Sequence, residues 1–200
     1  MLETCRTALK TFESLGCVVE EVPPPAAVEP AWQAFVKIRQ WQQGASIRAY
    51  YADPDKRALL KPEAQWEAEG GLKLSAYDIS AAGAVHTHWS NAVARLFDNH
   101  DYLVMPTAQV FAFDVNTHWP AEIAGQPMRT YHEWMKAICL ISLAGCPALA
   151  APAGFDGRGR AMGLQIIAPV HREMDCLRLA KAYEQALPAS VKRLPPLLQA

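Results

Sequence analysis

Serine and cysteine side chains are the groups of this chain that could attack a substrate as nucleophiles. None of the serines lies in a Gly-x-Ser-x-Gly turn, which exposes the hydroxyl beside an oxyanion site in many hydrolases. Ser75 is placed to cap a helix, and Ser142 lies in an apolar helix, where we expect a packing or backbone-bonding role. Cys146, between Gly145 and Pro147, is the best-placed thiol, but a buried thiol usually behaves as a small hydrophobic group. These residues alone reveal no catalytic centre.

The histidine and lysine residues indicate neither a metal site nor a catalytic pair. His86 and His88 are two positions apart, so on a helix they point about 200° apart and could not share one metal ion. The other histidines have no Cys, Asp or Glu partner at the spacing of metal ligands. Lys136 and Ser142 share one predicted helix, but nothing in the sequence adds an oxyanion hole to them. We therefore expect no metal, no cofactor and no catalytic residue in this sequence.

The composition is typical of a globular protein with little net charge. Hydrophobic residues make up 51% and charged residues 20% of the chain, and the formal net charge is −1. This charge gives no long-range attraction to nucleic acid or an anionic membrane, and no apolar run approaches the roughly 20 residues that span a bilayer. The first residues do not resemble a signal peptide, and five scattered cysteines favour free thiols in a reducing compartment. We expect one cytoplasmic domain over residues 1–200, with a loose tail at 188–200.

The spacing of apolar residues predicts helices and strands in alternation. Helices are expected at residues 2–12 with a cap at Gly16, at about 30–51, at 61–68 with an end at Gly70-Gly71, at 75–99, at 130–145 and at 172–187. Strands are expected at residues 17–22 and 102–105, and a turn-rich loop at 107–127. The patterns Ser75-x-x-Asp78 and Thr130-x-x-Glu133 are capping boxes, which place two of the helix starts.

Two apolar segments near the C-terminus flank a polar turn. Residues 147–155 and 162–168 lack clean alternation of polar and apolar side chains, which is typical of strands covered on both faces. The turn at residues 156–160 contains two glycines and can join neighbouring antiparallel strands. With the order of the other elements, this hairpin predicts an α/β fold: a mixed β-sheet covered by helices on both faces.

The same region resembles the C-terminal part of amidase signature enzymes. That family typically shows an Asn-x-x-Gly-x-Pro-Ala segment, a Pro-x-Gly-Phe strand end, a Gly-Leu-Gln strand and a closing helix. The stretches that carry the resemblance are residues 142–148, 152–155, 163–169 and 173–180, together with 100–107 and 8–22 upstream. Ser142 stands where the family often has asparagine. The matching stretches are spread over nearly the whole chain and occur in the same order as in the family. The resemblance therefore implies the C-terminal part of the amidase signature fold.

The resemblance also implies what is missing. Family members are typically more than twice this length, and their Ser–Ser–Lys triad lies in a glycine- and serine-rich signature of the N-terminal half. No such signature occurs in this sequence, so no catalytic residue is transferred and the chain alone is expected to be inactive. It would supply part of the sheet and one wall of the substrate pocket. The expected wall is the loop at 106–109 and the helix start at 131–134, with Thr107 and Trp134 as substrate-binding residues.

Three functions therefore stay open at the level of sequence. The first is the C-terminal part of an amidase that hydrolyses a carboxamide C–N bond to an acid and ammonia or an amine. The second is a non-catalytic binding or assembly module that keeps this half of the fold, and the third is a thiol hydrolase acting through Cys146. A sheet cut along one edge would expose unpaired backbone, so we also expect self-association into a homo-oligomer.

Overall fold

The computed structural model describes residues 1–192 and 198, which form two compact units. The first, here called the sheet unit, comprises Met1–Pro23, Leu96–Met128 and Gly145–Ala200, and the second, here called the helical unit, comprises Pro24–Arg95 and Arg129–Ala144. Most of the tail expected to be loose, residues 193–197 and 199–200, lies outside the described residues.

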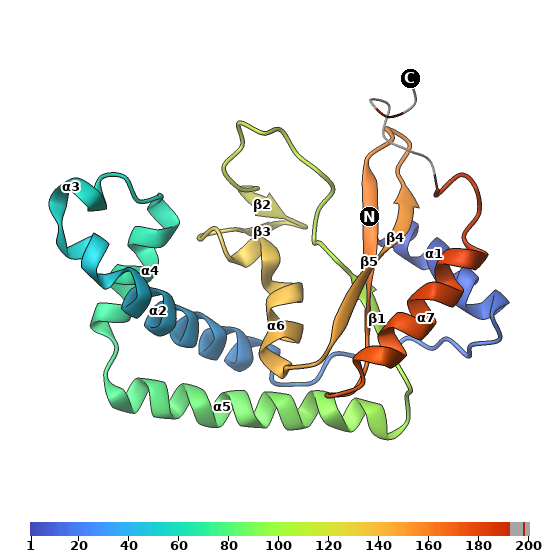
Figure 1. The fold of residues 1–200 in the computed structure, drawn as a ribbon, viewed down its shortest axis with the longest axis horizontal. Coiled ribbons are helices and arrows are strands. Elements are labelled where there is room, and N and C mark those ends of the chain that lie inside the picture. The colour runs from blue at the N-terminus through green and yellow to red at the C-terminus, as the bar shows by residue number, and fades with distance from the viewer. Residues whose placement is uncertain (193–197, 199–200) are drawn as a thin grey trace. The chain divides into compact units, whose positions relative to one another are not determined.

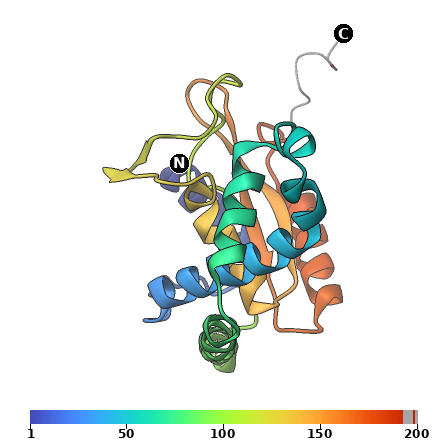
Figure 2. The ribbon, with the colours of Figure 1, turned by 90° about the vertical axis from the view of Figure 1, so that its left-hand side faces the viewer.

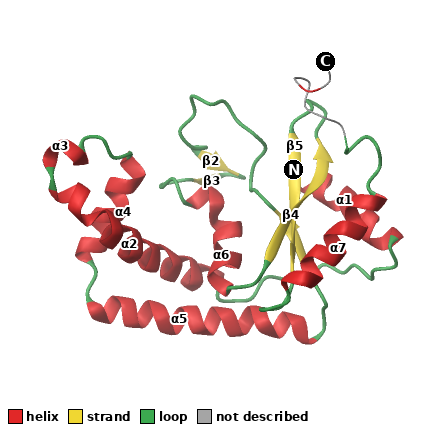
Figure 3. Ribbon diagram, viewed as in Figure 1, coloured by secondary structure: helices red, strands yellow, loops and turns green. Residues whose placement is uncertain are grey.

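A three-stranded antiparallel sheet is the centre of the sheet unit (Figures 1 and 3). Its strands are β1 (Leu103–Pro106), β4 (Ala148–Phe155) and β5 (Ala161–Ile167), in the order β1-β5-β4. The central position of β5 explains its apolar sequence, because Leu164, Ile166 and Ile167 are almost completely buried. The predicted hairpin and the α/β fold class are confirmed.

Helices α1 (Leu2–Ser14) and α7 (Glu173–Ala186) pack against this sheet and against each other. The rings of Phe12 and Tyr183 stack with their centroids 4.4 Å apart, and both side chains are buried. The Tyr183 hydroxyl donates a hydrogen bond of 2.9 Å to the carbonyl oxygen of Pro152 in β4. The amphipathic patterns that predicted both helices therefore correspond to one shared apolar core. The predicted cap of α1 at Gly16 is confirmed, because the backbone of this glycine has a φ of 86°.

The strand predicted at residues 17–22 is wrong. This segment has no regular secondary structure, and Val18 is 96% exposed. Valine favours strands, but a strand also needs a neighbouring backbone, and no segment among the described residues pairs with this one. The Cys17 amide instead donates to the carbonyl oxygen of Phe12 and closes the end of α1.

The helical unit consists of α2 (Val28–Ala52), α3 (Pro54–Arg57), α4 (Pro62–Lys73), α5 (Ala76–Ala94) and α6 (Lys136–Ala144). Helix α2 contacts each of the other four, and Figure 2 views α5 nearly along its axis. The capping box of α5 is confirmed: the Asp78 amide donates to Ser75 Oγ and the Ser75 amide donates to the Asp78 carboxylate. Helix α5 ends earlier than predicted, because a 3-10 turn at Arg95–Asp98 follows it.

The end predicted at Gly70-Gly71 for the helix at residues 61–68 is also wrong, since α4 continues through both glycines to Lys73. The glycines are needed for packing rather than for termination. A Cβ atom on Gly71 would lie 2.4 Å from the carbonyl oxygen of Gln40, and one on Gly44 would lie 3.2 Å from that of Glu67. Helices α2 and α4 therefore approach each other more closely than side chains would permit, and this contact outweighs the low helix propensity of glycine.

The loop predicted at residues 107–127 contains a short two-stranded ribbon. Its strands are β2 (Glu122–Ile123) and β3 (Gln126–Pro127), and Gly125 in the connecting turn has a φ of 79°. A left-handed backbone of this kind is accessible to glycine without a steric cost, so the ribbon turn depends on this residue.

Candidate functional site

The two predicted substrate-binding residues belong to different units. Thr107 follows β1 in the sheet unit, whereas Trp134 lies in a 3-10 turn, Glu133–Met135, of the helical unit. The contacts around Thr107 and around Trp134 are therefore described one after the other.

Thr107 is held against strand β5 at the point where the family resemblance has its Gly-Leu-Gln motif. The Thr107 amide donates a hydrogen bond of 3.0 Å to the carbonyl oxygen of Gly163. A Cβ atom on Gly163 would lie 2.6 Å from Thr107 Oγ1, so only glycine leaves space for this side chain. The buried side chain of Gln165 donates to the carbonyl oxygen of Pro106 at 3.2 Å. The glycine and glutamine of the motif thus fix the start of the loop that Thr107 opens.

Trp134 lies in the turn that leads into α6. The Glu133 carboxylate accepts hydrogen bonds from the backbone amides of Arg129 and Thr130, which is half of the capping box that the sequence predicts. The rings of Tyr131 and Trp134 meet edge to face, with centroids 6.1 Å apart. This turn therefore presents two aromatic rings, and the Glu133 carboxylate ties the backbone that leads into it at Arg129 and Thr130.

A cluster of polar side chains around a buried carboxylate lies beside this turn. We call it the Glu67 centre; its members are Arg39 of α2, Glu67 of α4 and His132. Glu67 Oε1 lies 2.5 Å from Arg39 Nε and 2.8 Å from His132 Nε2. Glu67 is only 5% exposed and His132 3% exposed. The ring of Trp66 stacks on His132, with centroids 5.4 Å apart.

The electrostatics of the Glu67 centre favour a charged carboxylate. Burial by itself raises the pKa of Glu67, but the hydrogen bonds from His132 and Arg39, with their charges, outweigh burial and lower the pKa below its usual value. Arg39 Nε and His132 Nε2 both face the same carboxylate oxygen, and these two nitrogen atoms lie 3.0 Å from each other. His132 Nδ1 is buried and has no hydrogen-bond partner within the described residues. The centre fixes His132, and with it the turn that carries Trp134, onto α2 and α4.

Sequence reasoning missed the Glu67 centre. Arg39 and Glu67 are 28 positions apart, and Arg39 and His132 are 93 positions apart, so no local spacing connects them. A histidine flanked by aromatic residues in a helix start was the only local signal, and many buried histidines share it. The three residues meet only because α2 and α4 pack closely through their glycines.

The nucleophile candidates have structural roles. Ser142 Oγ donates to the carbonyl oxygen of Ile138 at 3.2 Å, which confirms its expected backbone-bonding role. Lys136 Nζ forms an ion pair with Glu29 and lies 5.7 Å from the centre of the Trp32 ring. Burial raises the pKa of the Cys146 thiol, which opposes the acidic thiol that a cysteine hydrolase needs. The thiol-hydrolase hypothesis therefore loses its chemical basis.

Two kinds of feature are absent from the part of the chain that the structure describes. None of its helices has the length and apolar character needed to cross a bilayer. The described residues also contain no group of three or more His, Cys, Asp or Glu side chains that could hold a metal ion. His86 Nε2 lies 2.7 Å from the carbonyl oxygen of Leu143, so it is occupied in packing α5 against α6.

Comparison with known proteins gives consistent results. A glutamyl-tRNA(Gln) amidotransferase subunit of Synechococcus sp. (strain RCC307) is 30% identical over 211 aligned residues, which cover 94% of this chain and 42% of the relative. The chain thus spans about two-fifths of the length of the curated relatives that it matches.

Comparison with solved structures also finds proteins that share this fold. A bacterial aryl acylamidase of the amidase signature family superposes with a TM-score of 0.80 at 24% identity, over 93% of this chain and 40% of the other. A 6-aminohexanoate cyclic dimer hydrolase, solved with its substrate, superposes with a TM-score of 0.81 at 20% identity, over 98% and 43%. The family model described as Amidase matches residues 1–177. The chain belongs to the amidase signature family.

Proposed function

We propose that this chain is the C-terminal portion of an amidase that hydrolyses a carboxamide C–N bond to an acid and ammonia or an amine. The observation that carries this proposal is the family match over residues 1–177 of a chain that spans only about two-fifths of its relatives. The described residues contain no activated nucleophile beside a base, in keeping with a reaction that depends on residues outside this sequence.

In this proposal Thr107 and Trp134 are the substrate-binding residues. Thr107 qualifies because the loop start is held rigidly on β5, and Trp134 qualifies because its turn is capped and fixed by the Glu67 centre. Rigid support of this kind is what a binding residue needs, since a side chain that is already ordered loses little entropy when it binds. The substrate is a small amide, and neither nucleic acid nor a membrane is a partner.

We also propose a cytoplasmic location and self-association. All five cysteines are free thiols in the structure, as expected in a reducing compartment. Strand β4 is an edge of the sheet, and its residues Ala148, Ala150 and Pro152 are exposed. An exposed edge can pair with a second copy of the same chain. Light scattering tests this point: a monodisperse monomer would contradict self-association.

The first experiment on the proposed function measures the mass of the native polypeptide in its source. An amidase portion predicts a polypeptide well above the 22.0 kDa of this sequence. A native mass of 22.0 kDa would instead support the non-catalytic binding module, which the absence of a nucleophile–base pair among the described residues also favours.

A second experiment assays the purified chain for release of ammonia from a panel of small carboxamides. We expect no turnover. Turnover that survives Cys146→Ala would contradict the proposal, because it would require a nucleophile within this sequence that the structure assigns to packing. Turnover that Cys146→Ala abolishes would restore the thiol mechanism.

A further inference from the structure

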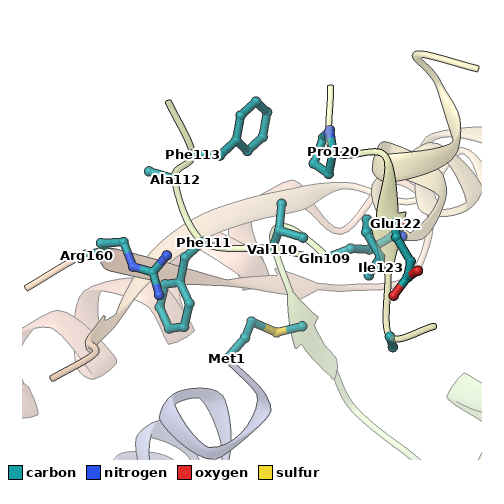
Figure 4. A pocket seen from close by; sticks show the side chains of 11 residues that line it. Met1, Gln109, Val110, Phe111, Ala112, Phe113, Pro120, Glu122, Ile123 and Arg160 are labelled. Carbon is teal, nitrogen blue, oxygen red and sulfur yellow. The ribbon is translucent and has the colours of Figure 1, made fainter. Parts of the chain in front are cut away.

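A pocket of about 430 Å³ in the sheet unit adjoins the loop that the proposed function assigns to the substrate (Figure 4). Gln109 belongs to both, and apolar side chains such as Val110 and Ile123 provide most of the lining. Because it begins at that loop, the pocket belongs with the function proposed above. A different feature of the same unit, an ion pair between Glu20 and His100, lies outside that proposal.

The Glu20–His100 pair joins two ends of the chain within the sheet unit. The chain first passes through the helical unit between residues 24 and 95. Residues 17–23 lead into this passage, and the 3-10 turn at Arg95–Asp98 leads out of it. Glu20 Oε1 lies 2.7 Å from His100 Nε2, although the two residues are 80 positions apart. The pair therefore connects the segment before the passage to the segment after it.

Few other polar contacts hold the segment that carries Glu20. In the described part of the chain, the backbone of residues 18–23 makes no hydrogen bond to other backbone groups. Val19 packs partly against the apolar core. Glu21 pairs with Arg6 at 3.5 Å, but both side chains are well exposed, and an exposed ion pair contributes little. Loss of the Glu20–His100 pair would therefore remove a large part of what fixes this segment.

Both ring nitrogen atoms of His100 face hydrogen-bond acceptors. Nδ1 lies 2.6 Å from the carbonyl oxygen of Leu96, and Nε2 lies 2.7 Å from the Glu20 carboxylate. A carbonyl oxygen and an ionised carboxylate accept hydrogen bonds but donate none, whereas a neutral imidazole donates from one nitrogen only. The arrangement is therefore complete only when His100 carries both protons and a positive charge.

The same contacts determine the pH at which His100 is charged. The bond to the Leu96 carbonyl raises the pKa of His100 above its ordinary value of 6.5, the bond to Glu20 and its negative charge raise it further, and together they outweigh partial desolvation. Glu20 is the charged group that faces the ring from another segment of the described chain, and Asp98 and Asp101 are charged neighbours in sequence. A raised pKa means that the pair is complete below pH 6.5 and is lost as the pH rises through the folded-state pKa.

We propose that the Glu20–His100 pair is a pH-sensitive restraint, which holds residues 17–23 at low pH and releases them at higher pH. The proton leaves from Nε2, because Leu96 is only four residues from His100, whereas the Glu20 side chain is 62% exposed and can turn into water. Nε2 then presents a lone pair to the carboxylate, and the two side chains separate. The inference needs no substrate, so it can fail while the proposed amidase function holds, and the reverse is equally true.

The test follows the rings of the six histidines in the full chain by NMR while the pH is raised. His100→Gln identifies the signal of His100 by its disappearance. We expect His100 to titrate with a midpoint above 6.5, and the backbone amide shifts of residues 17–22 to change with the same midpoint. A midpoint of 6.5 or lower, or amide shifts that do not follow His100, would overturn the proposal.

Two variants separate this pair from other surface charges. Glu20→Ala removes the partner of Nε2, so His100 should bind its proton about threefold more weakly, and residues 17–22 should no longer respond to its titration. Glu21→Ala is the matched control, because Glu21 is the next residue and pairs with Arg6 instead. It should leave both measurements unchanged. Both glutamates are exposed, so neither variant should unfold the protein. Equal effects of the two variants would contradict the proposal, because general surface charge would then set the titration.

Discussion

The sheet unit and the helical unit are stabilised in different ways. The core of the sheet unit is apolar, with Phe12 stacked on Tyr183 above the buried residues of β5. The helical unit contains close helix contacts through glycines and a buried carboxylate that an arginine and a histidine share. The stability of the first unit should therefore depend mainly on buried apolar area, whereas that of the second should also depend on a buried charge. Substitutions in each unit test this difference.

The largest effect is expected from Phe12→Ala in the sheet unit. Phe12 is 3% exposed and loses both its ring stack and its burial, so the free energy of unfolding should fall by about 3–5 kcal/mol. Urea denaturation measures this loss. Leu2→Ala on the same helix is the control, since Leu2 is 52% exposed and should cost well under about 1 kcal/mol. Equal losses for the two variants would mean that the ring stack does not hold this core.

A slightly smaller loss is expected from Glu67→Ala in the helical unit. The substitution leaves the buried His132 without its hydrogen-bond partner, whereas Arg39 is 39% exposed and can be solvated, so the loss should be about 2–3 kcal/mol. Glu69→Ala, on the exposed side of the same helix, should change the free energy of unfolding by no more than about 0.5 kcal/mol. If Glu67→Ala is as harmless as Glu69→Ala, the centre contributes nothing to stability.

Two glycine substitutions should have effects of opposite sign. Gly71→Ala places a Cβ atom 2.4 Å from the Gln40 carbonyl oxygen, and the resulting displacement should cost about 1–3 kcal/mol. Gly83→Ala lies in α5 with no atom within 4 Å of the new Cβ, so it should stabilise the protein by about 0.5–1 kcal/mol. Thermal unfolding of both variants gives the signs directly. A stabilising Gly71→Ala would show that the helices can separate without cost.

The smallest effect is a pH dependence of the stability that Glu67 contributes. The pKa of Glu67 is lower in the folded state than its ordinary value of 4.5, so its stabilising contribution is complete above that value and disappears as the pH falls through the folded pKa. The difference in the free energy of unfolding between the wild type and Glu67→Gln should therefore be constant near neutral pH and shrink in acid. Urea denaturation over a range of pH values measures it, and two parallel curves would refute the charge-dependent part of the comparison.

The sequence predicted the sheet unit better than the helical unit. Helices α1 and α7 follow from apolar residues that repeat with the helical period, and the hairpin of β4 and β5 follows from two apolar segments that flank a turn with two glycines. The strand expected at residues 17–22 failed because pairing depends on a neighbour that local sequence does not specify. The order of the predicted elements supplied the fold class and the resemblance supplied the family. The structure then explained the Gly-Leu-Gln motif of that family: Gly163 makes room for Thr107, and Gln165 donates a hydrogen bond to the Pro106 carbonyl.

The helical unit shows why the rest could not be predicted. Gly70 and Gly71 have the local signature of a helix end, but the approach of α2 keeps them within α4. The Glu67 centre depends on that same approach, and its members come from three separate stretches of chain. A site formed by packing alone leaves no spacing for sequence analysis to detect. Thr107 and Trp134 stay predictions as substrate-binding residues.

The interleaving of the two units has a consequence for biosynthesis. The helical unit is complete in sequence once residue 144 has been made, whereas the sheet unit still lacks β4, β5 and α7. On the ribosome, Phe12 of α1 therefore has no stacking partner until Tyr183 of α7 has been made. Until then, part of the apolar face of α1 is open to other proteins, including chaperones.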